Sequence, residues 1–84
     1  MTKHEANVGL AAIITTVAEV GEAPEGIMYA ALMGAYNFDD FTALLSICKR
    51  AGLLADAGMH LVKITDAGRD VARKIEAHAA GARA

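Results

Sequence analysis

The spacing of hydrophobic residues differs from one segment of the 84-residue chain to the next. From Leu10 to Val17, apolar residues recur three and four positions apart, which predicts a helix rather than a strand. Asn7 precedes this pattern and is the expected N-cap, while Gly21 follows it and is the expected stop. The pattern therefore predicts a first helix between these two residues, with residues 1–6 as a frayed tail.

A second helix is predicted over residues 25–36, directly after the only proline of the chain, Pro24. No charged residue lies between Glu25 and Asp39, so this helix is apolar on all sides and requires cover on all sides. One reading is an unusually buried helix in a tight core. The reading we favour is an interface with a second copy or another protein, formed by Ile27, Ala30 and Met33.

A third helix is the clearest pattern in the chain and covers about residues 39–51. Acidic Asp39 and Asp40 occupy its first turn and basic residues its last turn, as the helix dipole favours, and Gly52 can close it in a left-handed conformation. Its buried face is expected to consist of the apolar residues at i, i+3, i+4 and i+7, namely Phe41, Leu44, Leu45 and Cys48.

Two short strands are predicted in residues 53–65, around a turn in which Gly58 can adopt positive φ. Thr65 is the expected N-cap of a last helix, and Gly68 permits a close approach between that helix and the strand before it. The fold class is therefore mainly α with a small β-hairpin (α+β): three helices, a two-stranded hairpin and a C-terminal helix. We expect one domain over residues 1–84, with a core of about residues 7–77 and a second frayed tail at residues 78–84.

Charge and cysteine content narrow the classes of function. The net charge is −2, but residues 1–42 carry −5 and residues 43–84 carry +3. A single cysteine excludes an intrachain disulfide and suits a reducing compartment. The chain has no signal-peptide pattern and no apolar run of roughly 20 residues, which a membrane-spanning helix requires. We therefore expect a cytoplasmic protein that does not enter a membrane.

The C-terminal half, "KRAGLL" followed by "HLVKITDAGRDVARKI", resembles the winged helix-turn-helix domains of bacterial and archaeal transcription regulators. The resemblance covers about residues 24–76. It implies a DNA-binding transcriptional regulator with a recognition helix at about residues 39–51 and a short wing, acting as a homodimer. The positions that match the family's motif are Arg50, Gly52, Leu53, Ile64, Thr65 and Gly68. The positions implied to contact DNA are Thr42, Ser46, Lys49, Arg50, His60 and Lys63.

The residues also support an alternative, because Asp39 and Asp40 would repel phosphates at the groove-entering end of the third helix. A winged-helix module that contacts another protein and does not bind DNA accounts for this charge. Lys49 and Arg50 are equally well explained as residues that favour the end of a helix dipole. The three histidines show no metal-ligand spacing, and the chain offers no nucleophile–base set. We therefore expect no metal, no cofactor and no enzymatic activity.

Overall fold

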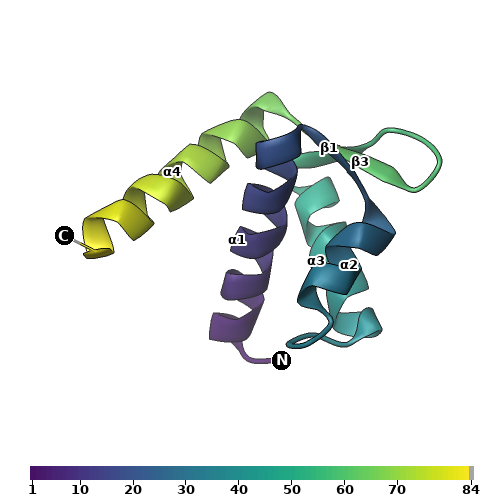
Figure 1. The fold of residues 1–84 in the computed structure, drawn as a ribbon, viewed down its shortest axis with the longest axis horizontal. Helices are drawn as coiled ribbons and strands as arrows, with labels where there is room; N and C mark the ends of the chain where they lie inside the picture. Colours follow the sequence, from purple (N-terminus) through teal and green to yellow (C-terminus); the bar gives the residue numbers. More distant parts are fainter. Residues whose placement is uncertain (84) are drawn as a thin grey trace.

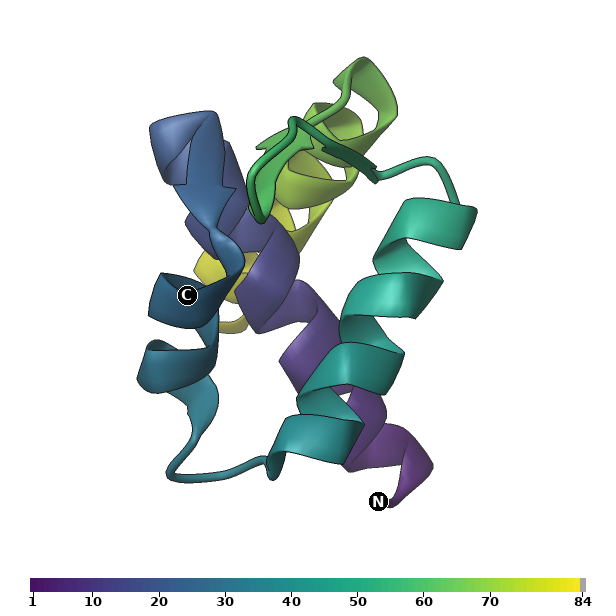
Figure 2. The same cartoon turned by 90° about the vertical axis from the view of Figure 1, so that its right-hand side faces the viewer.

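The computed structural model describes residues 1–83 and contains helices together with one small antiparallel sheet, an α+β arrangement (Figure 1). The elements follow one another along the chain as α1 (Lys3–Val20), β1 (Glu22–Pro24), α2 (Glu25–Leu32), α3 (Phe38–Arg50), β2 (Leu54–Asp56), β3 (Leu61–Ile64) and α4 (Asp66–Arg83). Helix α1 lies at the centre, with α2 and α3 on one side and α4 diverging on the other (Figures 1 and 2). The hairpin β2–β3 extends over the ends of α2 and α3.

Helix α1 begins five residues earlier than the sequence pattern predicts. Its N-cap is Thr2, whose hydroxyl accepts a hydrogen bond from the Glu5 backbone N–H at 3.1 Å. The predicted N-cap, Asn7, is therefore wrong. The residues that precede Asn7 are good helix formers and continue the helix back to Thr2. The predicted stop is confirmed, because Gly21 adopts φ 82° and donates its N–H to the Val17 carbonyl.

The sheet has three strands in the order β1–β3–β2, and not the two strands expected from the sequence. The strands β2 and β3 pair antiparallel, with Leu54 opposite Ile64. The strand that the pattern missed, β1, pairs antiparallel with the other edge of β3 and places Pro24 opposite Leu61. Pro24 is tolerated there because an edge strand does not need every N–H. The strand β1 has only three residues, which is too few to show the alternation of apolar and polar residues typical of a strand.

Helix α2 ends at Leu32, four residues before the predicted end. The chain then turns so that Tyr36 becomes buried, and its hydroxyl donates a hydrogen bond to the Glu5 carbonyl of α1 at 2.5 Å. Gly9 makes room for this contact, since a Cβ there would lie 3.0 Å from the Tyr36 ring and 2.6 Å from the Leu44 side chain. A contact between residues 31 apart therefore determines where α2 ends.

The remaining local predictions for the C-terminal half are confirmed. Gly52 and Gly58 adopt φ 77° and 83°. The Thr65 hydroxyl accepts a hydrogen bond from the Gly68 N–H at 3.0 Å and caps α4. Gly68 is buried, and a Cβ at this position would collide with the Leu53 carbonyl oxygen. The helix α4 is thus seated directly against the chain that leads into β2.

The core lies where α1, α3 and the sheet meet, and α4 packs against α1. All four residues predicted for the buried face of α3 are buried there. The structure places helix in both end segments for which frayed tails were expected, since α1 includes residues 3–6 and α4 continues to Arg83. Ala84 lies outside the described residues. Within residues 1–83, no helix is both long enough and apolar enough to cross a membrane.

Candidate interaction groove between α2 and α3

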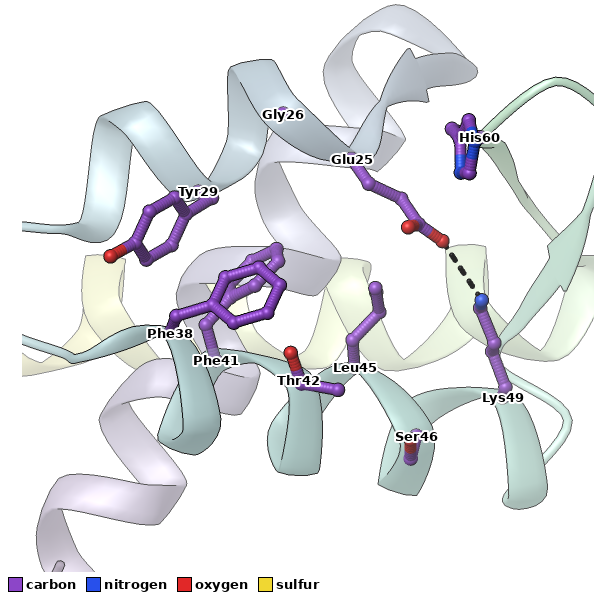
Figure 3. Close-up of a pocket in the computed structure, with 10 residues that line it drawn as sticks. All are labelled: Glu25, Gly26, Tyr29, Phe38, Phe41, Thr42, Leu45, Ser46, Lys49 and His60. Carbon is purple, nitrogen blue, oxygen red and sulfur yellow. Dashed lines mark hydrogen bonds and ion pairs between the residues drawn. The ribbon is translucent and has the colours of Figure 1, made fainter.

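A cavity of about 360 Å³ lies between α2 and α3, next to the loop that joins β2 to β3 (Figure 3). We call it the α2–α3 groove. The close-up shows α2 along one side and α3 along the other, with aromatic rings at one end and charged side chains at the other. The lining residues are Glu25, Gly26, Tyr29, Phe38, Phe41, Thr42, Leu45, Ser46, Lys49 and His60.

The aromatic end of the groove consists of three rings from α2 and α3. Tyr29 contacts Phe38 edge-to-face, with ring centroids 5.4 Å apart and an interplanar angle of 86°, and it also contacts Phe41 at 5.4 Å. Such geometry is favourable for aromatic pairs. Phe38 nevertheless remains 60% exposed, because it is the first residue of α3 and only one side of its ring is covered.

The start of α3 is fixed by a local cap. The Asn37 side-chain oxygen accepts a hydrogen bond from the Asp40 backbone N–H at 2.8 Å. This bond satisfies one of the N–H groups that the first helical turn leaves without an intrahelical partner. Because Phe38 follows the cap directly, the cap also positions the exposed ring at the mouth of the groove.

The charged end of the groove contains a lysine held by two carboxylates. The Lys49 Nζ lies 3.0 Å from Glu25 Oε1 and 2.7 Å from Asp56 Oδ1. The hydrogen bond that Lys49 donates to Asp56 is the main reason that the pKa of Lys49 is raised above its ordinary value, and Glu25 adds to the effect. We call Glu25 and Asp56 the carboxylate clamp. Lysine and clamp together carry a charge of −1, so the ammonium is already neutralised from within the chain.

The loop between β2 and β3 closes this end of the groove. The His60 carbonyl accepts a hydrogen bond from the Glu25 backbone N–H at 2.9 Å, which joins the loop to the first residue of α2. Met59 and His60 both adopt positive φ, 50° and 61°, which is uncommon for residues with a Cβ. As a result Met59 stands at the tip of the loop with 93% of its surface exposed.

The structure brings together four of the six residues that the resemblance implies for DNA contact. Thr42, Ser46, Lys49 and His60 line the α2–α3 groove, whereas Arg50 and Lys63 are exposed but outside it. The predicted interface residues of α2 lie outside the groove lining as well. All three are exposed, Ile27 to 65% and Met33 to 60%. The surface of α2 is therefore open in this structure, and the reading of an unusually buried helix is wrong.

Sequence reasoning missed the carboxylate clamp and the aromatic end of the groove. Glu25 and Lys49 are 24 residues apart, so no local pattern connects them. The only available signal was that two neighbouring helices carry opposite charges at the ends that face the hairpin. Tyr29 and Phe38 could have been found as aromatic residues on either side of the turn between the two predicted helices.

Cys48 lies on the buried side of α3, behind the groove, and is 0% exposed. Burial raises the pKa of its thiol from 9.0 to about 11, so the thiol stays neutral at physiological pH. A neutral thiol is a poor nucleophile and a poor metal ligand. Cys48 therefore packs as a small apolar residue, as the sequence pattern indicates.

The groove is lined by aromatic, aliphatic, hydroxyl and charged side chains. Within residues 1–83, no group of three or more His, Cys, Asp or Glu side chains is placed to hold a metal ion. Comparisons of the chain with protein-family models, with curated proteins and with solved structures gave no match. Its function therefore has to be argued from the groove itself.

Proposed function

We propose that this chain is a winged-helix protein-interaction module, cytoplasmic and non-catalytic, that contacts another protein through the α2–α3 groove. One observation carries the proposal. Lys49, the cation of α3 that lines the groove, is held between Glu25 and Asp56 beside a ring-lined cavity. A lysine that pairs with two carboxylates has little charge left for phosphate, whereas the exposed Phe38 ring at the other end of the groove suits an apolar side chain.

The winged-helix part of the proposal is supported by the order of the elements and by the motif residues. A strand precedes α2, the two helices α2 and α3 follow each other, and a hairpin leads into the last helix. Thr65 caps that helix, and its hydroxyl also donates to the Gly52 carbonyl at 2.6 Å. The motif therefore acts as a structural junction in this chain. Fold analogy alone does not indicate what such a domain binds.

The charges at the start of α3 favour protein over DNA as the partner. Asp39 and Asp40 occupy the first turn of the helix. That end of a recognition helix faces base edges in a helix-turn-helix complex, where carboxylates meet the negative field of the phosphates. Affinity for DNA depends on the number of phosphates that cations neutralise, and here acidic groups dominate.

A second candidate, the DNA-binding transcriptional regulator, is favoured by Arg50 and Lys63. Both are exposed, and neither belongs to the ion pairs of residues 1–83. A homodimer would present two copies of each cation, and the exposed Ile27, Ala30 and Met33 could form its contact surface. Arg50 is also able to contact guanine in a bidentate manner.

Fluorescence anisotropy with random-sequence duplex DNA at low and moderate salt separates the two candidates. We expect no salt-sensitive binding by the wild-type chain. The Glu25→Gln/Asp56→Asn variant should gain weak binding at low salt, since it releases Lys49 from the carboxylate clamp. The control is Asp66→Asn/Glu76→Gln, which removes the same charge from α4 and should bind no better than wild type. Circular dichroism verifies that each variant is folded.

Salt-sensitive binding of wild-type protein that Lys49→Ala/Arg50→Ala abolishes would overturn the interaction module in favour of the regulator. A log–log salt plot then gives the number of phosphates contacted, at a slope of roughly −0.9 per phosphate on B-form DNA. Equal binding by the clamp variant and by the control would show that the clamp does not restrain Lys49.

A further inference from the structure

The aromatic end of the α2–α3 groove is shaped for a side chain rather than for a cofactor. The volume of the whole groove, about 360 Å³, is at the lower end of the ~300–1,000 Å³ typical of ligand pockets. Tyr29, Phe38, Phe41 and Leu45 provide apolar surface, and the half-exposed Phe38 ring has one side available for a further contact. Such a site accepts an aromatic or a branched aliphatic side chain as an anchor.

The surroundings of the groove are acidic. Asp39 and Asp40 directly follow Phe38 in the first turn of α3, and the carboxylate clamp lies at the opposite end. Against these four carboxylates stand Lys49 and the next residue of α3, Arg50, so the groove and its ends carry a charge of −2. We call the four carboxylates, Glu25, Asp39, Asp40 and Asp56, the acidic rim. Complementary potentials across an interface steer association and suppress the wrong partner.

We infer that the partner of the groove is a basic protein segment, which packs one aromatic or aliphatic side chain against the exposed side of the Phe38 ring and places lysine or arginine against the acidic rim. The inference rests on the proposed function and specifies its partner class. Because Asp39 and Asp40 adjoin the aromatic end, the basic residues of the segment should immediately flank its anchor. The groove would then bind a positively charged chain where a DNA-reading domain binds a negatively charged one.

Selection of random displayed peptides on the 84-residue chain tests this inference. Bound peptides are counter-selected on Thr42→Trp, which adds bulk to a lining residue that is exposed on α3. The matched control is Ala43→Trp on the next residue of the same helix, which is also exposed but does not line the groove. We expect enriched peptides with an apolar anchor flanked by lysine or arginine. They should bind wild type and Ala43→Trp alike and fail to bind Thr42→Trp.

The contribution of the acidic rim is measured by titrating an enriched peptide against Asp39→Asn/Asp40→Asn. The control variant is Asp66→Asn/Asp70→Asn, which removes two carboxylates from the first turns of α4. We expect the rim variant to bind about two- to tenfold more weakly at low salt, since it removes two exposed ion pairs, each of which contributes little. The difference should shrink at high salt because the charges are screened.

Two results would overturn the inference. Groove-dependent peptides without an excess of basic residues, or with unchanged affinity for the rim variant, would reject the basic partner and leave the interaction module intact. Failure to enrich any peptide that distinguishes Thr42→Trp from Ala43→Trp would reject the groove as a peptide site. The DNA titration then decides separately whether the proposed function also fails.

Discussion

Helices α2 and α3 form the two sides of one groove, yet they are stabilised in different ways. Helix α3 has a side-chain cap, acidic residues in its first turn, basic residues in its last turn and four buried residues. Helix α2 has no side-chain cap and buries only Met28. The first is specified by its own sequence. Helix α2 depends on the strand β1, which precedes it, and on Tyr36, which turns the chain into the core after its last residue.

This difference indicates which surface each helix leaves exposed for contact with a partner. The apolar stripe of α3 is buried in the core, and apart from Phe38 and Ile47 its outward face is mainly polar. The apolar surface of α2 exceeds what the core covers, and residues such as Ile27 remain 65% exposed. Single exposed apolar residues are normal on a protein surface. Here they lie on the helix that forms one side of the α2–α3 groove, although Ile27, Ala30 and Met33 do not line it.

The largest expected effect is on the core side of α3. Leu44 is 0% exposed and contacts α1 close to Gly9. The Leu44→Ala substitution should lower the free energy of unfolding by about 2–5 kcal/mol, the loss typical for a buried leucine. Ile27→Ala on α2 should change it by less than about 0.5 kcal/mol. Urea denaturation measures both changes.

The same experiment tests whether α2 is covered by a second copy. A loss of more than about 1 kcal/mol for Ile27→Ala that grows with protein concentration would show that the α2 surface is buried in a dimer. Equal losses for Leu44→Ala and Ile27→Ala in a monomer would contradict the contrast between the two helices.

An intermediate effect is expected from pH, because α3 contains both residues with shifted pKa values. An unfolded Cys48 thiol ionises near pH 9, whereas burial raises the folded pKa to about 11. The unfolded state therefore releases its proton first, and stability falls as pH rises from 9 to 11. The raised pKa of Lys49 acts in the same direction, since its stabilisation is present below the unfolded pKa and is lost above it.

The Cys48 contribution should be on the order of 3 kcal/mol, at about 1.4 kcal/mol per pKa unit. Urea midpoints recorded from neutral pH to pH 11 measure the decline. Cys48→Ala is the control. This variant should be less stable at neutral pH, and its stability should decline less as pH rises, because only the smaller contribution of Lys49 remains. A wild-type chain that is fully stable at pH 11 would show that the thiol is less enclosed than its 0% exposure indicates.

The parts of the fold that local sequence specifies were predictable, and those that depend on distant contacts were not. The stripe of α3, the left-handed Gly52 and the Thr65 cap each rest on neighbours within a few residues. By contrast, β1 exists because β3 supplies its partner, some 40 residues later. The end of α2 was misplaced for the same reason, since Tyr36 turns away to reach Glu5.

The candidate site shows the same division. The exposed face of α3 follows from its helical period, which places Thr42 and Ser46 where the structure has them. Lys49 was expected there too, but no pattern could show that Glu25 and Asp56 surround its ammonium group. The two ion pairs change what the Lys49 side chain is available to bind. They change a candidate phosphate contact into part of an acidic surface.

The smallest expected effect concerns the cap that starts α3. Asn37→Ala removes the bond to the Asp40 N–H and should cost about 1 kcal/mol, within the range of about 0.5–2 kcal/mol for N-caps. Asn7→Ala is the matched control, because Asn7 is exposed within α1 and caps nothing. A loss at Asn7 as large as at Asn37 would contradict the cap assignment.

The Asn37→Ala variant also tests whether peptide binding in the groove requires the N-cap of α3. Without the cap the first turn of α3 frays, and Phe38 loses the backbone that holds its ring against Tyr29. Asn37→Ala should therefore weaken an enriched peptide more than Asn7→Ala does, even at a temperature where both variants are fully folded. Equal affinities would show that Tyr29 alone positions Phe38. The specificity of the groove would then come from α2, the helix whose own sequence specifies it least.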